Sequence, residues 1–269
     1  MRKSVLSAAV AAALTVPTLA AAQTPAPAPS PFTGNISLVS DYRFRGITQT
    51  FEEPALQGGV DYAHASGLYL GNWNSNVSPG AGFPGGNLEM DFYGGWKKAF
   101  GDFGLDVGFI YYFYPGTDAG VGIPFSPANN RPGGAVASGT VDNKEFYIGG
   151  TWKFLSLKYF HSIDDYFSTP DTKNTNYIDL SGTYDFGGGW GLVGHIGKLD
   201  FKNMNDASYT DWKLGVTKDL SGWVFGLTYV DTDAKGDCGS GQFYCFGNGT
   251  GKTTDAGNST VVFSISKTF

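Results

Sequence analysis

The stretch from Ser259 to Phe269 reads STVVFSISKTF and predicts a β-strand that runs to the end of the chain. Its apolar residues Val261, Phe263 and Ile265 recur at every second position, and the positions between them are mostly serine and threonine. Such alternation with a period of two indicates a half-buried strand, with one face in apolar surroundings and the other in polar surroundings. The chain therefore ends within an ordered strand.

The composition narrows the class of protein to which such a strand can belong. Charged residues make up 16% of the chain, against about 25% in ordinary soluble domains. Aromatic residues also make up 16%, and there are 40 glycines. After the first 22 residues no stretch approaches the roughly 20 apolar residues of a membrane helix. Since only helices and closed barrels span lipid, the composition favours a β-barrel over a soluble β-sandwich.

The first 22 residues have the features of a secretory signal peptide. Arg2 and Lys3 precede a short alanine-rich apolar run, and small side chains at residues 20–22 suit a cleavage site. The absence of a basic flank after the run disfavours a membrane anchor. We expect residues 23–31 (QTPAPAPSP) to form a proline- and alanine-rich periplasmic tail, with a plug inside the pore as the alternative. Residues 32–269 are predicted to form a single barrel.

Twelve segments of alternating polarity follow one another along this part of the chain. They are Asn35–Arg45, Leu56–Tyr62, Gly67–Ser75, Leu88–Lys97, Leu105–Tyr114, Glu145–Phe154, Leu157–Ser162, Tyr177–Phe186, Trp190–Lys198, Asp211–Lys218, Trp223–Asp231 and the terminal strand. Short and long connections alternate between them, and the long ones fall at 46–55, 76–87, 115–144, 163–176, 199–210 and 232–258. The pattern predicts an all-β fold, a closed antiparallel transmembrane barrel of 12 strands with short periplasmic turns and long extracellular loops.

Six tryptophans fall near the ends of the predicted strands, where amphipathic rings gather at membrane interfaces. We assign all six to an aromatic girdle: Trp73, Trp96, Trp152, Trp190, Trp212 and Trp223. Trp73 is the least regular of them, because pointing it at lipid turns Leu68 and Leu70 inward.

Four stretches resemble the TorF-type porin family, and the resemblance covers essentially the whole mature chain. They are Leu38–Gly46 (LVSDYRFRG), Pro54–Tyr62 (PALQGGVDY), Tyr209–Leu220 (YTDWKLGVTKDL) and Val262–Phe269 (VFSISKTF). The resemblance implies a channel in the outer membrane of a Gram-negative bacterium, with membrane lipid and lipopolysaccharide as neighbours.

The chain terminus also resembles the signal by which the barrel-assembly machinery recognises outer-membrane barrels, and this implies that Phe269 is an assembly signal. Lys267 departs from the pattern, because the third residue from the end is usually aromatic or apolar in that signal.

The predicted inward faces of the strands carry nine acidic and six basic residues, which give a net charge of −3. They are Asp41, Arg43, Arg45, Asp61, Glu89, Asp91, Lys97, Asp106, Glu145, Lys153, Lys158, Asp179, Asp185, Asp211 and Lys213. A charged lumen favours a porin-like channel for passive diffusion of small hydrophilic solutes. Two alternatives remain: a substrate-specific channel for acidic oligosaccharides that uses Arg43 and Arg45, and a closed structural or adhesive barrel whose charges pair with one another.

The sequence predicts no enzyme, no cofactor and no metal site. A barrel that hydrolyses lipid needs histidine beside serine on the lipid face, whereas His64 and Ser66 fall at a periplasmic turn and His161 and Ser162 point to opposite faces. His195 has no nucleophile near it in sequence, and three scattered histidines do not form a metal site. The net charge of −6 argues against nucleic acid as a partner.

Cys238 and Cys245 lie in the last long loop, and an even number of cysteines in an exported protein predicts a disulfide. A reactive thiol pair is the alternative, although only Lys235 nearby would activate it. The loop at residues 115–144 is stiffened by its prolines and is expected either to fold into the pore or to cap the surface: Pro115, Pro124, Pro127 and Pro132.

Overall fold

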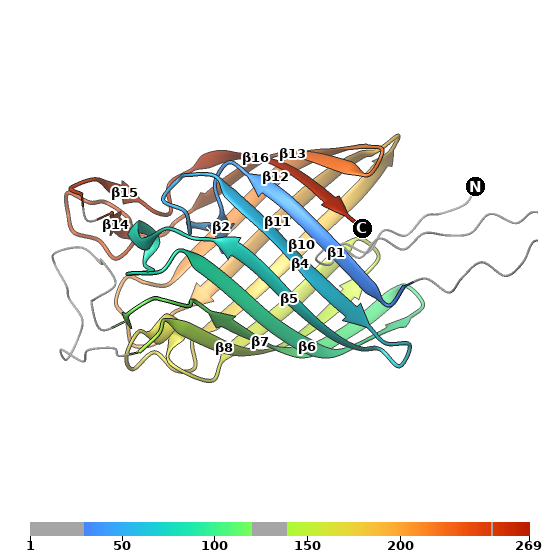
Figure 1. Cartoon of the computed structure of the whole chain (residues 1–269), viewed down its shortest axis with the longest axis horizontal. Coiled ribbons are helices and arrows are strands. Elements are labelled where there is room, and N and C mark those ends of the chain that lie inside the picture. The colour runs from blue at the N-terminus through green and yellow to red at the C-terminus, as the bar shows by residue number, and fades with distance from the viewer. Residues whose placement is uncertain (1–29, 120–138, 249) are drawn as a thin grey trace, which may run out of the picture.

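A computed structural model describes residues 30–119, 139–248 and 250–269. In it twelve long strands, each antiparallel to its neighbours, close into a barrel (Figure 1). They are β1 (Phe32–Val39), β4 (Ala55–Ala63), β5 (Leu68–Asn76), β6 (Leu88–Phe100), β7 (Phe103–Phe113), β8 (Asp142–Trp152), β9 (Leu155–Ser162), β10 (Asn176–Gly187), β11 (Trp190–Asp200), β12 (Tyr209–Leu220), β13 (Trp223–Thr232) and β16 (Thr260–Thr268). The predicted fold class and number of strands are confirmed. The predicted signal peptide, nearly all of the predicted tail, and Pro124, Pro127 and Pro132 lie outside the described residues.

The barrel closes where its last strand meets its first. β16 pairs with β13 on one side and with β1 on the other. The amide of Phe269 donates to the carbonyl of Gly34 (2.8 Å), and the amide of Gly34 donates to the carbonyl of Phe269 (3.1 Å). The terminal residue is therefore part of the hydrogen-bonded wall.

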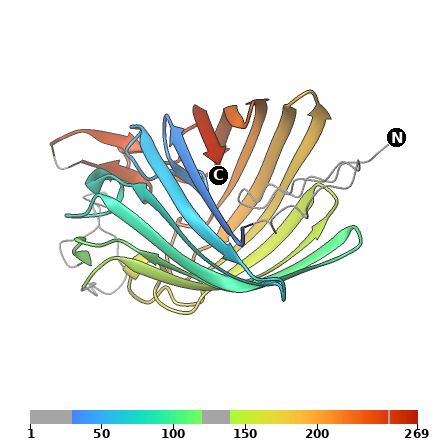
Figure 2. The ribbon, with the colours of Figure 1, turned by 45° about the vertical axis from the view of Figure 1, so that its right-hand side comes forward.

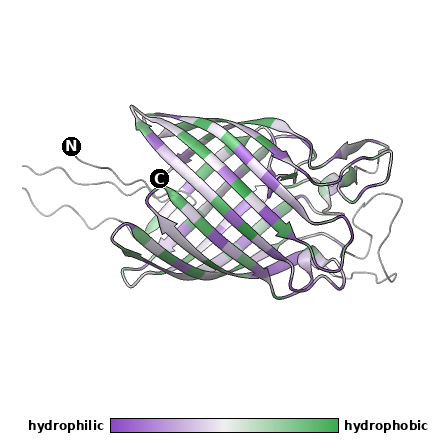
Figure 3. Cartoon of the chain, turned by 180° about the vertical axis from the view of Figure 1, so that it is seen from behind, coloured by the Kyte–Doolittle hydropathy of each residue, from purple (hydrophilic) through white to green (hydrophobic). Residues whose placement is uncertain are grey.

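The outer face of the wall is apolar, and Figure 3 shows hydrophobic residues distributed along its strands. In β16 the outward side chains of Val261 and Phe263 are 55% and 54% exposed, whereas a water-soluble domain rarely leaves such a continuous apolar surface uncovered. Within the described ranges no helix is long and apolar enough to cross a membrane.

The two ends of the barrel differ. Tight turns connect the strands at one end, here called the short-turn end, and extended loops connect them at the other, the long-loop end (Figure 2). The buried apolar cluster belongs largely to the long-loop end, because its members come from the loops and the adjoining strand ends. It includes Ile47, Val77, Phe83, Tyr112, Tyr114, Val141, Tyr166, Leu199, Phe201, Tyr209, Tyr244 and Phe246. The loops also contain the short elements β2 (Arg43–Phe44), β3 (Ile47–Thr48), η1 (Pro79–Ala81), η3 (Tyr166–Ser168), β14 (Cys245–Gly247) and β15 (Thr253–Asp255).

The first strand is shorter than the sequence predicts. β1 ends at Val39, not at Arg45, and the chain then turns back on itself so that β2 pairs with β3. Arg45 and Gly46 form the tip of this hairpin with φ values of 49° and 81°. Two consecutive positive φ values are typical of the type I′ turn, which matches the twist of a two-residue hairpin.

Two predicted side-chain positions are wrong. β5 turns Leu68 and Leu70 outward, with exposed fractions of 57% and 65%. Alternation then points Trp73 into the barrel, where its ring centroid is 5.5 Å from that of Tyr42. Lys153, predicted to line the pore, lies in the turn between β8 and β9, and its ammonium is 4.7 Å from the ring centroid of Trp152.

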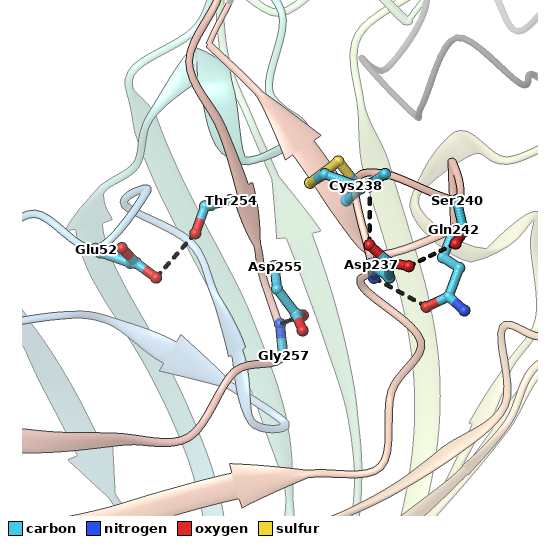
Figure 4. Close-up of a disulfide and its surroundings, with 10 residues drawn as sticks. Glu52, Asp237, Cys238, Ser240, Gln242, Thr254, Asp255 and Gly257 are labelled. Atoms are coloured by element: carbon cyan, nitrogen blue, oxygen red, sulfur yellow. Dashed lines mark hydrogen bonds between the residues drawn. A yellow bond between two sulfur atoms is a disulfide. The ribbon is translucent and has the colours of Figure 1, made fainter.

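The last long loop is held by the disulfide between Cys238 and Cys245, whose Cα atoms are 4.9 Å apart (Figure 4). Beside it the carboxylate of Asp237 accepts hydrogen bonds from the hydroxyl of Ser240 (2.5 Å) and the amide of Gly239 (2.9 Å). These two donors lower the pKa of Asp237. The loop therefore has a fixed conformation next to the disulfide.

Candidate functional site

The loop between β1 and β4, residues 40–54, folds into the long-loop end of the barrel and is called the plug hairpin here. Its backbone is anchored on both sides: the amide of Thr48 donates to the carbonyl of Ala256 (2.9 Å), and the carbonyl of Gln49 accepts from the amide of Ser78 (2.9 Å). Ile47 and Thr48 are buried. The plug hairpin therefore occupies space that an open pore would leave to solvent.

Arg45, at the tip of the plug hairpin, forms a forked ion pair with Glu145 on β8. The two nitrogens donate to the two carboxylate oxygens at 3.0 and 2.8 Å, and one of them also donates to the hydroxyl of Tyr166 (2.9 Å). Arg45 is 9% exposed and Glu145 is 1% exposed. Planar bidentate pairs of this kind are strong and geometrically specific, so the pair fixes the position of the tip.

Four aromatic rings surround the guanidinium of Arg45. Its Cζ atom is 4.2 Å from the ring centroid of Tyr177 and 4.8 Å from that of Phe44, and the rings of Phe160 and Tyr166 lie at 5.1 and 5.8 Å. Burial lowers the pKa of Arg45, but Glu145 together with Tyr166 and Tyr112 raises it, and the net pKa lies above its ordinary value. Arg45 is therefore charged and fully engaged by neighbouring groups of the protein.

Arg43 joins the plug hairpin to the last long loop. Its guanidinium donates to Asp41 (2.5 Å), to the carbonyls of Ala256 and Asn258 (3.0 Å each), and to the Oδ1 atom of Asn258 (2.9 Å). The other carboxylate oxygen of Asp41 accepts from the hydroxyl of Thr48 (2.6 Å). Asp41 and Arg43 thus serve the internal structure of the plug hairpin and its attachment.

Farther from the long-loop end than the plug hairpin, a second polar network surrounds His195 on β11. The Nδ1 atom is 3.1 Å from a carboxylate oxygen of Asp179, and Nε2 is 2.8 Å from one of Asp211. The hydroxyl of Tyr177 donates to Asp211 (2.9 Å). Because the ring of Tyr177 also contacts Arg45, the two networks are continuous across the interior.

Ser181 brings a hydroxyl to this network, with its Oγ atom 3.0 Å from Nδ1 of His195. Serine, histidine and aspartate in contact suggest a nucleophile, but Ser181 donates to Asp179 at 2.6 Å. The single hydroxyl hydrogen of Ser181 is thus used on Asp179, so Nδ1 of His195 must donate to Ser181 Oγ. Nε2 donates to the carboxylate of Asp211, and the imidazole then holds both protons. A doubly protonated histidine cannot take the proton of Ser181, which argues against catalysis here.

Two carboxylates of β6 are buried on the other side of the lumen. Glu89 is 0% exposed and accepts from the hydroxyl of Tyr114 (2.8 Å), and Asp91 is 6% exposed. Tyr42 of the plug hairpin is partly buried there, and the burial of its hydroxyl, with Glu89 and Asp91 nearby, raises the pKa of Tyr42. These acids therefore form part of the wall against which the plug hairpin packs.

Toward the short-turn end the inward charges are also engaged by neighbouring side chains, through an ion pair, hydroxyl hydrogen bonds and a ring contact. Asp106 accepts from Lys158 (2.7 Å) and from the hydroxyl of Tyr69 (2.6 Å), and Asp61 accepts from the hydroxyl of Tyr93 (2.6 Å). The ammonium of Lys97 lies 5.2 Å from the ring centroid of Tyr69. Asp185 is at the edge of the barrel, exposed, with its carboxylate accepting from the amide of Gly187.

A cavity of about 610 Å³, with both charged and apolar side chains in its lining, lies between the plug hairpin and the wall. Its lining includes Asp179, Ser181, His195 and Lys213 on β10, β11 and β12. On the side of the loops a smaller apolar cavity of about 90 Å³ is lined by Phe44 and other buried rings. The plug hairpin thus borders both a larger cavity lined in part by charged side chains and a smaller apolar cavity within the loops.

Among the described residues no group of three or more histidine, cysteine, aspartate or glutamate side chains has a geometry that could hold a metal ion. Many polar groups of the lumen pair with one another, whereas Glu89 Oε2, Asp91 Oδ1 and Asn143 Nδ2 are buried without a hydrogen-bond partner among the residues that the structure describes.

A family model described as "Bacterial protein of unknown function (Gcw_chp)" matches residues 22–269. The chain belongs to this family. A search of curated proteins found no match. Membership of the TorF-type porin family remains a prediction.

Solved structures with folds similar to that of this Gcw_chp protein include three porins. A KdgM porin is 7% identical, with 88% of this chain and 98% of that chain covered and a TM-score of 0.50. A NanC porin is 10% identical, with 88% and 98% covered and a TM-score of 0.47. An anion-selective porin from Comamonas acidovorans is 12% identical, with 88% and 98% covered and a TM-score of 0.39. At these identities the likeness to the KdgM porin shows the fold alone.

Of the residues predicted to line the pore, the structure of the Gcw_chp chain brings Arg45 and Glu145 into one buried pair. It brings Asp179 and Asp211 to His195, which the sequence analysis considered only as a catalytic or metal-binding candidate and did not include in the pore-lining set. It also adds Tyr177 and Ser181, whose roles depend on the pairing of β10 with β11, in which Ser181 stands opposite His195. An apolar-to-polar alternation places a residue on a face but does not identify its partner across strands.

Proposed function

We propose that the protein is an outer-membrane porin-like channel for passive diffusion of small hydrophilic solutes. The observation that supports this most directly is the cavity of about 610 Å³, with charged side chains in its lining, inside a closed barrel with an apolar outer surface. A barrel of 12 strands lies between the filled interiors of eight strands and the open channels of sixteen. Its interior can therefore hold both a plug and a solute path.

The proposed setting is the outer membrane of a Gram-negative bacterium, in contact with lipid and lipopolysaccharide. Residues 1–22 would be the export signal, residues 23–31 a periplasmic tail and residues 32–269 the barrel, inserted by the barrel-assembly machinery with Phe269 as its signal. The short-turn end would then face the periplasm and the long-loop end the exterior. Strands of eight to thirteen residues suit an apolar band about 25 Å tall.

Most charges inside the barrel are paired with one another, which favours small hydrophilic solutes and does not require that the solute be charged. Arg43 and Arg45 would be the ligands of an acidic oligosaccharide, but Asp41 and Glu145 already neutralise them. Lys213, on the cavity wall opposite His195, differs from these arginines: it is exposed, and no described carboxylate forms an ion pair with it. A specific channel for acidic oligosaccharides therefore has less support than a channel for small hydrophilic solutes.

A closed structural barrel is the second candidate, and the plug hairpin is the observation that favours it. The plug hairpin and the apolar loop cluster occupy the long-loop end, so the conformation described has a restricted interior. A channel then requires a path around the plug hairpin or its displacement.

Reconstitution of the mature protein into planar lipid bilayers separates the two candidates. A channel gives discrete conductance steps in symmetrical potassium chloride, and neutral sugars of increasing size should reduce them up to a size limit. Folded protein that inserts without any conductance over a wide voltage range would refute the channel and support the closed barrel.

A further inference from the structure

Four lysines lie on the outer surface of the barrel at the short-turn end, each against an aromatic ring. The distances from ammonium to ring centroid are 5.5 Å for Lys98 on Phe100, 4.7 Å for Lys153 on Trp152, and 4.8 Å both for Lys218 on Trp190 and for Lys267 on Trp223. We call these four residues, Lys98, Lys153, Lys218 and Lys267, the lysine girdle.

The positions of these lysines follow from the strands that hold them. Lys98, Lys218 and Lys267 occupy the outward-facing register of β6, β12 and β16, next to the last apolar residues of each strand. Trp190 stands directly opposite Lys218 in the sheet, as Trp223 does opposite Lys267. The lysine girdle is therefore built into the wall, at the edge of its apolar surface.

The aromatic partners remain open to the surroundings. Phe100 is 54% exposed, Trp152 45%, Trp190 51% and Trp223 41%. An aromatic face attracts an ammonium group and holds its aliphatic stem against the surface, so the charge is presented outward at the border between apolar and polar surroundings.

Among the described residues the charges of the lysine girdle have no acidic partner. In the described part of the chain no carboxylate lies within 4.0 Å of any of these four ammonium groups. Lys218 donates to a carbonyl, that of Gly188 (2.7 Å). By contrast Lys202 and Lys235, in loops at the opposite end, are each paired with an aspartate at 2.5 Å. The charges of the girdle are thus available to an external anion.

We propose that the lysine girdle binds the phosphate groups of anionic phospholipids, such as phosphatidylglycerol, in the leaflet that surrounds the short-turn end. Acyl chains would pack on the apolar wall while the phosphate meets the ammonium at its edge, a complementarity that an acidic soluble partner does not have. Lys267 stands at a position that is usually aromatic or apolar in the assembly signal, and on this proposal it would contribute to lipid binding. The inference rests on the proposed membrane location and not on conduction.

The test is native mass spectrometry of the full mature protein in detergent with equal amounts of phosphatidylglycerol and phosphatidylcholine of the same acyl chains. A lysine near an anionic surface contributes about 1 kcal/mol, or about a fivefold preference. The wild type should therefore retain phosphatidylglycerol at least about fivefold over phosphatidylcholine, and the variant K98Q/K153Q/K218Q/K267Q should retain both about equally.

The matched control removes four lysines from the long-loop end, K173Q/K202Q/K235Q/K252Q, and should keep the wild-type preference. Equal phosphatidylglycerol retention by the wild type and the girdle variant would overturn the proposal, as would an equal loss in the control. Displacement of the lipid by millimolar inorganic phosphate would overturn lipid as the occupant.

Folding is checked by heat-dependent migration on gels. If the fourfold girdle variant does not fold, the pairs K98Q/K153Q and K218Q/K267Q are measured, and each should show a reduced preference; an undiminished one in both would overturn the proposal. Conductance of the same preparations separates the two proposals: lipid preference without conductance refutes the channel and leaves the lysine girdle in place.

Discussion

Replacing Arg45 by alanine should release the plug hairpin and increase the conductance of the barrel. The substitution removes two charge-assisted hydrogen bonds to Glu145, one hydrogen bond to Tyr166 and the contacts with four rings. It also leaves Glu145, which is 1% exposed, without its counter-ion. The docked position of the plug hairpin therefore loses its main electrostatic restraint.

The size of the effect follows from the burial of the pair. Removing one partner of a buried ion pair costs about 3 to 5 kcal/mol, and each 1.36 kcal/mol is a factor of ten. The ratio of docked to released plug hairpin should then fall by about 160-fold to about 5000-fold. The hydroxyls of Tyr112 and Ser162 still donate hydrogen bonds to the carboxylate of Glu145 at 3.3 Å each. These bonds stabilise the unpaired charge and favour the smaller of the two fold-changes.

The assay is single-channel recording in planar bilayers, with wild type and variant compared at the same voltage. Arg45→Ala should show larger steps or longer open times, and Arg45→Ala with Glu145→Ala should remain open while regaining thermal stability, because no unpaired charge is left. Lys97→Ala is the control, since it removes a cation from the inner face away from the plug hairpin. Unchanged conductance in folded Arg45→Ala would refute the restraint by this ion pair.

Three further outcomes are expected. Gly46→Ala should also raise conductance in bilayers, because a Cβ there would lie 2.3 Å from Thr232 and the residue has a φ of 81°; wild-type conductance would show that the tip tolerates the change. Maleimide should label Cys238 and Cys245 only after reduction, since the structure joins them in a disulfide; labelling of untreated protein would contradict that bond in the mature chain. Deletion of Phe269 should lower the amount of folded protein in the outer membrane, because two hydrogen bonds at the closing seam are lost with it; immunoblots of membrane fractions measure this, and equal amounts would remove its assembly role.

The barrel could be predicted from sequence because its main constraint is local. Lipid-facing and lumen-facing residues alternate along the strands of such barrels. The apolar side chains of Val261 and Phe263 therefore indicate, from the sequence alone, which side of the terminal strand faces outward, and both are exposed in the structure. Trp73 was misplaced because its segment has apolar residues on both faces. Its inward position depends on packing against Tyr42, a partner 31 residues away in sequence that strand periodicity does not identify.

The plug hairpin could not be predicted in the same way. Tyr42 and Phe44 alternate with Arg43 and Arg45, so the segment looks like the continuation of a strand. The only local sign of a reversal is Gly46, which follows Arg45 at the turn. The pairing of Arg45 with Glu145 joins residues 100 positions apart, and such a contact needs the closed barrel before it is visible.

The attachment of Arg43 to the last loop has a consequence for the order of folding. Its partners Ala256 and Asn258 follow it by 213 and 215 residues and immediately precede the terminal strand. Contacts over such long sequence separations form late, because the entropy of closing the intervening loop must first be overcome. The plug hairpin can therefore reach its final position only when the two ends of the chain have met. Docking of Arg43 would make the native interior a product of barrel closure, and an intermediate with an unsealed seam would lack this attachment.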